Sequence, residues 1–337
     1  MTTTTGVARS QRESAAIAVF GAWMISGLFL DGWAHDTDRP ETFFSPWHGI
    51  LYSGFAAAVV WFAWDGWRAK REATSVVDAG PADRVVTIGL ITFIIGAVGD
   101  GLWHEIFGIE VDLEALVSPS HLALLIGGFL MVSSPVRLAA ADPTYDGTTW
   151  RKWFPQGVTL MLSTALVLFF TQYLSVFETI AALPHNGSDL NEFRAVADLA
   201  AILATNAILV IPMLFVLWRW RTPFGAFTLL FGACGLLLSG LEGFELVELV
   251  IAFAFGGLIA DIVAARNRNP LAVAAVASWA MWLVFFAIAD ASYGIEWSPE
   301  LWAGAVVLAT ASSALLAALT KPPVPVPSLR SADASAG

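Results

Sequence analysis

Charged residues and cysteines are scarce in this sequence. Of its 337 residues, 13% are charged, whereas a typical soluble domain has about 25%. The single cysteine, Cys234, excludes an intrachain disulfide and a cysteine-ligated metal cluster. The sequence also has no phosphate-binding loop, dinucleotide-binding fingerprint or nucleophile elbow. It therefore gives no support to an NTP-driven or acyl-transfer enzyme.

Apolar residues are abundant instead, at 57% of the chain with a mean hydropathy of +0.69. They occur in blocks of the length that crosses a bilayer, about 20 residues. We therefore predict an all-α integral membrane protein of about ten transmembrane helices, arranged as repeated helical hairpins in the lipid bilayer, with no nucleic-acid partner. The predicted spans are residues 15–33, 46–64, 85–104, 119–139, 156–181, 196–218, 223–241, 246–265, 270–291 and 299–320.

These spans divide the chain into four predicted regions. A polar N-terminal segment covers residues 1–14 and precedes a four-helix region at 15–140. A six-helix region follows at 141–320, and the tail at 321–337 is rich in proline, serine and alanine. Such a composition is typical of disorder, so we expect the tail to be disordered.

The positions of lysine and arginine predict the orientation. With ten spans, fifteen of the seventeen basic residues fall on the side of the N-terminus, and only Arg39 and Arg194 fall on the other. The positive-inside rule then places both termini in the cytoplasm of a multi-pass cell-membrane protein. All five histidines and most acidic residues come to lie at the extracytoplasmic ends of helices, where an acidic rim would concentrate cations.

One polar motif occurs twice within the four-helix region. Each copy has an Asp-Gly pair, a histidine four residues after the aspartate, a short acidic loop, and a Ser-Pro-x-His sequence that precedes an apolar stretch. The spacing of four places the aspartate and the first histidine on one helix face, and Ser-Pro favours a new helix start. The six side chains are Asp31, His35 and His48 in the first copy, and Asp100, His104 and His121 in the second.

Two imidazoles and a carboxylate form a metal-binding set that suits copper, zinc or iron. The alternative is that each side chain caps a helix or hydrogen-bonds within the bundle. Duplication of the whole set favours metal binding, because ionisable residues near a bilayer are costly. A further acidic group, Glu242, Glu245 and Glu248, is predicted to share one helix face, where it would relay protons, bind a cation or line a hydrated inner surface.

The first copy, Asp31-x3-His35-x12-His48, resembles the copper motif in the C subunit of the particulate methane and ammonia monooxygenase family. The second copy falls where that family has an Asn, His and His set, with Asp100 at the asparagine position. The resemblance covers residues 25–135. It implies copper as cofactor and oxygen-dependent hydroxylation of a small apolar molecule beside monooxygenase partner subunits. The ligand chemistry leaves iron or zinc as alternatives, and a homo-oligomer is the alternative assembly.

Two departures from that family bear on these expectations. The acidic residue that precedes its aspartate motif is Phe29 here, and the chain beyond residue 150 has no counterpart in its C subunit. Copper binding therefore carries over more directly than hydroxylation. A copper or divalent-cation transporter or chaperone, and a structural membrane subunit, remain the alternative functions.

The ten-span topology can be tested by cysteine labelling on a Cys234→Ala background. Ser75→Cys lies in a loop predicted to be cytoplasmic, and Ser188→Cys lies in a loop predicted to face outside. We expect an impermeant maleimide to label only position 188 in intact cells. Labelling of position 75 without permeabilisation would contradict the topology.

Overall fold

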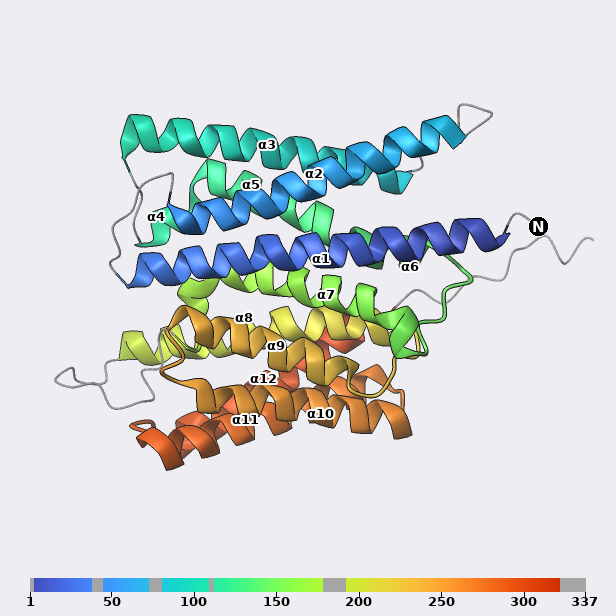
Figure 1. Ribbon diagram of the computed structural model, residues 1–337. Helices are drawn as coiled ribbons and strands as arrows, with labels where there is room; N and C mark the ends of the chain where they lie inside the picture. Colours follow the sequence, from blue (N-terminus) through green and yellow to red (C-terminus); the bar gives the residue numbers. More distant parts are fainter. Residues whose placement is uncertain (1–2, 38–44, 73–80, 109–111, 178–191, 322–337) are drawn as a thin grey trace, which may run out of the picture.

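The computed structural model describes residues 3–37, 45–72, 81–108, 112–177 and 192–321. The described residues form a bundle of helices that lie roughly parallel to a common axis, and they contain no strand (Figure 1). His185 and the predicted disordered tail after Lys321 fall outside these ranges. The elements are α1 (Thr3–Asp36), α2 (Pro46–Glu72), α3 (Pro81–Phe107), α4 (Asp112–Val117), α5 (Pro119–Val132), α6 (Ser134–Ala141), α7 (Trp150–Phe170), η1 (Gln172–Leu174), α8 (Glu192–Leu217), α9 (Ala226–Leu241), η2 (Val247–Leu249), α10 (Val250–Arg266), α11 (Pro270–Tyr293) and α12 (Pro299–Leu319).

Every predicted span overlaps a helix or consecutive helices, and the span at 156–181 runs past α7 and η1 into residues outside the described ranges. Seven helices in the described ranges are long and apolar enough to cross a membrane, and α5 with α6, bent by 44°, form an eighth candidate. The chain is therefore an all-α membrane-spanning protein, as predicted. The other two predicted spans, α9 and α2, are not among these long apolar helices. Helix α9 has only 16 residues, and α2 contains polar residues that include His48, Tyr52 and Asp65.

Most consecutive helices pack against one another as hairpins. The most extensively packed pairs are α3 with α5, α1 with α2, α10 with α11, α9 with α10, and α11 with α12. Helix α7 departs from this pattern because it packs mainly against α1 and α9, and much less against α8. It therefore joins the four-helix region to the six-helix region instead of forming a tight hairpin.

Glycines allow the first hairpin to close. A Cβ at Gly27 in α1 would lie 2.5 Å from the backbone nitrogen of Leu51, and one at Gly54 in α2 would lie 2.7 Å from that of Met24. Only a residue without a side chain fits such a crossing, which is the usual role of small residues between membrane helices. The two backbones are thus in direct contact below the predicted ligands.

The second hairpin repeats this crossing. A Cβ at Gly96 in α3 would lie 2.9 Å from the nitrogen of Leu124, and one at Gly127 in α5 would lie 2.5 Å from that of Phe93. These contacts are offset from those of the first hairpin by 69 residues in the first helix and 73 in the second. The same offsets relate the two Asp/His/His sets, so the duplication includes the helix crossing as well as the motif.

A polar network locks the six-helix region. Asn206 in α8 is fully buried and donates to Ser313 Oγ of α12 at 2.8 Å, while its Oδ1 accepts from the indole of Trp282 in α11 at 3.1 Å. Ser278 of α11 lies 2.6 Å from Ser313. A buried network is stabilising when its members are satisfied, and this one joins α8 to the last two helices of the chain.

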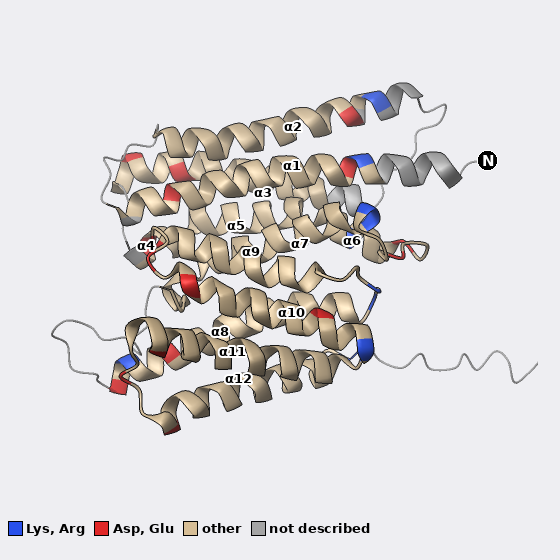
Figure 2. Cartoon of the chain, turned by 60° about the horizontal axis from the view of Figure 1, so that its bottom comes forward, with Lys and Arg blue, Asp and Glu red and all other residues tan. Residues whose placement is uncertain are grey.

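Contacts at one end of the bundle join several helix termini. Gln156 in the first turns of α7 lies 3.5 Å from Ser14 in α1. Trp153 of α7 packs against Trp220, which follows α8, and Arg268 in the turn before α11 donates to the Trp220 carbonyl. Lysine and arginine gather at this end, where the N-terminus lies, while the opposite end is mainly acidic (Figure 2).

The glycine crossings predict a sharp contrast between two Gly→Ala variants. Gly27→Ala would place a methyl group within 2.5 Å of the α2 backbone, and overpacking of this kind costs about 1–3 kcal/mol. Gly304 in α12 has nothing within 4 Å, and alanine there should stabilise the helix by about 0.5–1 kcal/mol. Thermal unfolding in detergent should show a lower Tm for Gly27→Ala and an unchanged or higher Tm for Gly304→Ala. Equal Tm values would show that α1 and α2 do not cross this closely.

Candidate metal centre

A cavity of about 610 Å³ lies at the end of the bundle opposite the N-terminus, and all six predicted ligands line it. Its outer part is polar, because these side chains come from the last turns of α1 and α3 and the first turns of α2 and α5. Its inner part is apolar and includes Met24, Phe93, Leu124 and Leu166. Met24 lies seven residues before Asp31, so the apolar part extends about 10 Å below the ligands at the helical rise.

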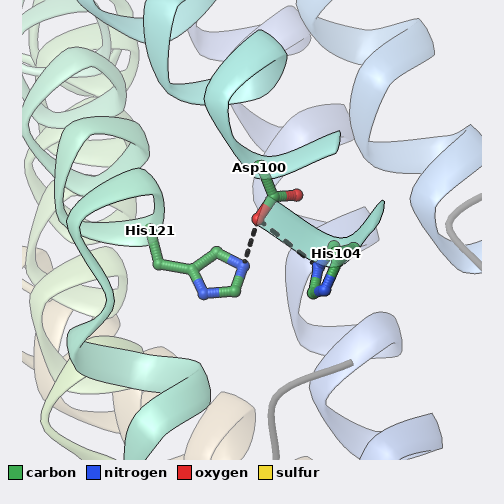
Figure 3. Close-up of side chains that lie close together, drawn as sticks. All are labelled: Asp100, His104 and His121. Atoms are coloured by element: carbon green, nitrogen blue, oxygen red, sulfur yellow. Dashed lines mark ion pairs between the residues drawn. The ribbon is translucent and has the colours of Figure 1, made fainter. Parts of the chain in front are cut away.

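Asp100, His104 and His121 converge in this cavity (Figure 3). Asp100 Oδ1 lies 2.9 Å from Nε2 of His121 and 3.5 Å from Nε2 of His104. Asp100 is only 1% exposed, and one ligand atom from each residue lies within 4.8 Å of the other two. A carboxylate oxygen and two imidazole nitrogens at these separations could share one metal ion.

Local helix chemistry explains this arrangement. Asp100 and His104 are four residues apart on α3 and therefore share a face. Ser118 is the N-cap of α5, and Pro119 occupies the first turn. The Ser118 hydroxyl accepts from the backbone N–H of His121 and lies 3.0 Å from its Nδ1. This contact holds the ring with Nε2 toward Asp100.

One oxygen of the Asp100 carboxylate accepts no hydrogen bond and is available to a metal. Oδ1 is buried and accepts no hydrogen bond from the described residues, although the two ring nitrogens lie within ion-pair distance of it. A buried carboxylate oxygen without a hydrogen bond is costly. A divalent cation between Oδ1 and the two Nε2 atoms would supply the missing charge.

Asp31, His35 and His48 are also brought together, but in a different arrangement. His48 Nδ1 lies 3.1 Å from Asp31 Oδ1 and 3.0 Å from the hydroxyl of Ser45, while His35 Nε2 lies 3.8 Å from Asp31 Oδ2. The same His48 nitrogen thus faces both the cap and the carboxylate, whereas His121 divides these contacts between its two nitrogens. Among the described residues, the Asp100 set alone brings its three ligand atoms within 4.8 Å of one another.

The sequence interpretation missed several residues of the cavity. Tyr52 lies one turn after His48 on α2 and donates a hydrogen bond to Asp100 Oδ2 at 3.3 Å. Its spacing from His48 was the available signal. Phe169, Gln172 and Tyr173 line the cavity from the six-helix region, and the sequence holds no local pattern that connects them to the motifs.

The prediction that Glu242, Glu245 and Glu248 share a helix face is wrong. Helix α9 ends at Leu241, where Gly243 and Phe244 have positive φ values of 61° and 65°. The N–H groups of these two residues bond back to the carbonyls of the last turn, as in a Schellman motif. Of the three glutamates, Glu242 alone lines the cavity.

No family model, curated protein or solved structure matches this chain. Its function is therefore inferred from the cavity and from the residue motifs that line it.

Asparagine at position 100 should have opposite effects on the metal-free and metal-bound protein. Asp100→Asn removes a buried charge whose Oδ1 accepts no hydrogen bond, so the metal-free protein should gain stability on the order of 1–3 kcal/mol. Loss of the ionised ligand should weaken metal binding. Thermal unfolding in detergent, with a chelator and with metal, measures both effects.

Asp261→Asn is a matched comparison. That carboxylate is buried but accepts from the backbone of Phe227 and from the backbone and hydroxyl of Thr228, so asparagine there should destabilise the protein with or without metal. A metal-free Asp100→Asn protein that is also less stable than wild type would show that Oδ1 is satisfied.

Proposed function

We propose that this protein is a membrane metalloprotein with a copper centre at the extracytoplasmic end of its bundle. The observation that carries the proposal is the buried convergence of Asp100 Oδ1 with the Nε2 atoms of His104 and His121. This set suits copper and also iron or zinc. The resemblance of both motifs to the methane and ammonia monooxygenase C subunit favours copper.

The first copy of the motif would form a second site. Asp31, His35 and His48 line the same cavity, and their helices cross as α3 and α5 do. A turn of the His48 ring that directs Nε2 to Asp31 and keeps Nδ1 on Ser45 would reproduce the His121 arrangement. Metal binding would favour that rotamer because it directs Nε2, the ring nitrogen that does not contact Ser45, toward the carboxylate.

The activity we propose is oxygen-dependent hydroxylation of a small apolar molecule. Copper, when bound, would supply the chemistry that activates oxygen. His104 and His121 would anchor it and Asp100 would balance its charge. The apolar inner part of the cavity, with Met24 and Phe93, would hold a molecule of this kind away from water.

Partner monooxygenase subunits or further copies of the chain would pack outside this cavity. Its wall on the side of the six-helix region is already formed by Phe169, Phe170 and Glu242. A Cβ at Gly32 would lie 2.6 Å from the Phe169 ring, so α1 and α7 leave no room for a partner between them. In this proposal the six-helix region completes the cavity within a single chain.

The proposed membrane topology has ten spans arranged as hairpins, with both termini in the cytoplasm. The gathering of basic residues at one end of the bundle supports this orientation (Figure 2). The indole of Trp218, which follows α8, also donates to Thr320 at the end of α12 at 3.4 Å. That contact joins the ends of α8 and α12 and supports an even number of spans.

Glu242 favours a second candidate, a copper or divalent-cation transporter or chaperone. Its carboxylate lines the cavity together with the two Asp/His/His sets and could take part in cation capture. A transport path also needs polar groups across the bilayer, whereas the inner part of this cavity is apolar. A structural subunit stapled by metal would need no cavity of this size.

Metal analysis of the purified protein tests the proposal. We expect up to two copper equivalents in wild type, and the loss of about one in His104→Ala or His121→Ala because a three-ligand site rarely retains its metal without an imidazole. His35→Ala and His48→Ala should each remove the other equivalent. His185→Ala, which changes the fifth histidine of the chain, is the control and should retain both.

Unchanged copper content in all four motif variants would reject the metalloprotein assignment. Oxygen consumption coupled to hydroxylation of a small alkane, with a supplied reductant, would support the enzyme. Copper uptake by proteoliposomes without oxygen consumption would support the transporter.

A further inference from the structure

Tyr52 contacts both Asp/His/His sets. Its hydroxyl donates to Asp100 Oδ2 at 3.3 Å. Its ring is stacked on His48, with ring centroids 6.1 Å apart and planes inclined by 17°. The side chain is therefore held by a ligand of the first set while it bonds to a ligand of the second.

The hydrogen bond gives the two oxygens of Asp100 different tasks. Oδ2 is engaged by Tyr52, while Oδ1 faces His104 and His121. A carboxylate fixed at one oxygen presents the other in a defined direction. Partners of this kind typically change metal affinity by 10–100-fold, because they orient the ligand before the metal arrives.

The internal duplication shows that the hydrogen bond from a tyrosine to the aspartate is present in one set only. The offset of 73 residues that relates His48 to His121 relates Tyr52 to Leu125, which has no group to donate. Asp31 accepts no hydroxyl hydrogen bond within the described residues, and it is 8% exposed whereas Asp100 is 1% exposed. The two sets share a helix crossing and a serine cap and differ at Tyr52.

We propose that Tyr52 is a positioning residue that makes the Asp100 set the higher-affinity of the two metal sites. This inference rests on the proposed metalloprotein function. Tyr52 holds Asp100 with Oδ1 toward the histidines, so the second set is formed before metal binds. The first set lacks this support and must reorient His48. Copper therefore fills the Asp100 set first.

Tyr52→Phe tests the inference because it removes the hydroxyl and keeps the ring on His48. The variant is made in two backgrounds. His35→Ala disables the first set without removing the His48 ring, and His104→Ala disables the second. Copper affinity is measured by competition with a chelating dye in detergent, and the copper(II) EPR spectrum reports the ligand environment.

In the His35→Ala background, Tyr52→Phe should weaken copper binding by about 10–100-fold and change the EPR spectrum. In the His104→Ala background, the same change should leave both readouts unaltered. Tyr173→Phe is the matched control, because Tyr173 lines the same cavity and makes no hydrogen bond within the described residues. It should leave copper affinity unchanged in either background.

Equal losses in the two backgrounds, or no loss in the His35→Ala background, would overturn the role of Tyr52. An equal loss for Tyr173→Phe would assign the effect to the cavity and would also overturn it. These outcomes differ from failure of the proposed function, in which neither parent background binds copper. A thermal melt of each metal-free variant identifies any variant that loses copper affinity through unfolding. In that case Tyr52→Trp is used as a second variant, because tryptophan retains a ring with a hydrogen-bond donor. The inference predicts that Tyr52→Trp restores part of the copper affinity.

Discussion

A carboxylate buried among apolar helices requires a compensating charge or hydrogen bonds, and Asp100 is the residue around which the four-helix region is arranged. Asp100 is 1% exposed; one carboxylate oxygen accepts a hydrogen bond from Tyr52, and the other faces His104 and His121 without accepting a hydrogen bond. The glycine crossing of α3 with α5 brings the start of α5 close enough for His121 to reach it. Backbone contact between two helices thus determines which side chains meet at the site.

Duplication explains both the likeness and the difference of the two sets. The hairpins share their crossing and their serine caps, because these depend on residues at matching offsets. They differ in the orientation of the histidine ring within each hairpin and in the hydrogen bond of Tyr52, which joins the two hairpins. An internal repeat can therefore retain its backbone geometry while its two sites acquire different properties.

The six-helix region gives the cavity its closed side. Helix α7 packs against α1 and α9, which places Phe169 and Phe170 beside the ligand-bearing helices. The turn after α9 places Glu242 at the same cavity. The six-helix region, whose sequence holds no copy of the full motif, thus contributes both apolar and acidic surface to the site.

Local rules account for the features that the sequence predicted correctly. The spacing of Asp100 and His104 sets a shared face, and Ser118 with Pro119 begins a helix, because both effects involve residues within one turn. The orientation of the His48 ring and the hydrogen bond of Tyr52 depend on side chains from neighbouring helices. Hydropathy located α9 and its end at Leu241, whereas the spacing of the glutamates wrongly continued the helix, because consecutive positive φ values at Gly243 and Phe244 end it.

The network around Asn206 has a consequence for biogenesis. Asn206 in α8 bonds to Ser313 in α12, 107 residues later in the chain, so its partner is synthesised only when the last helix is made. Until then, the amide N–H groups of Asn206 lack their native acceptors, although its oxygen can already accept from Trp282 of α11. The docking of α12 is therefore a late step of folding, and the six-helix region supports the wall of the cavity after that step.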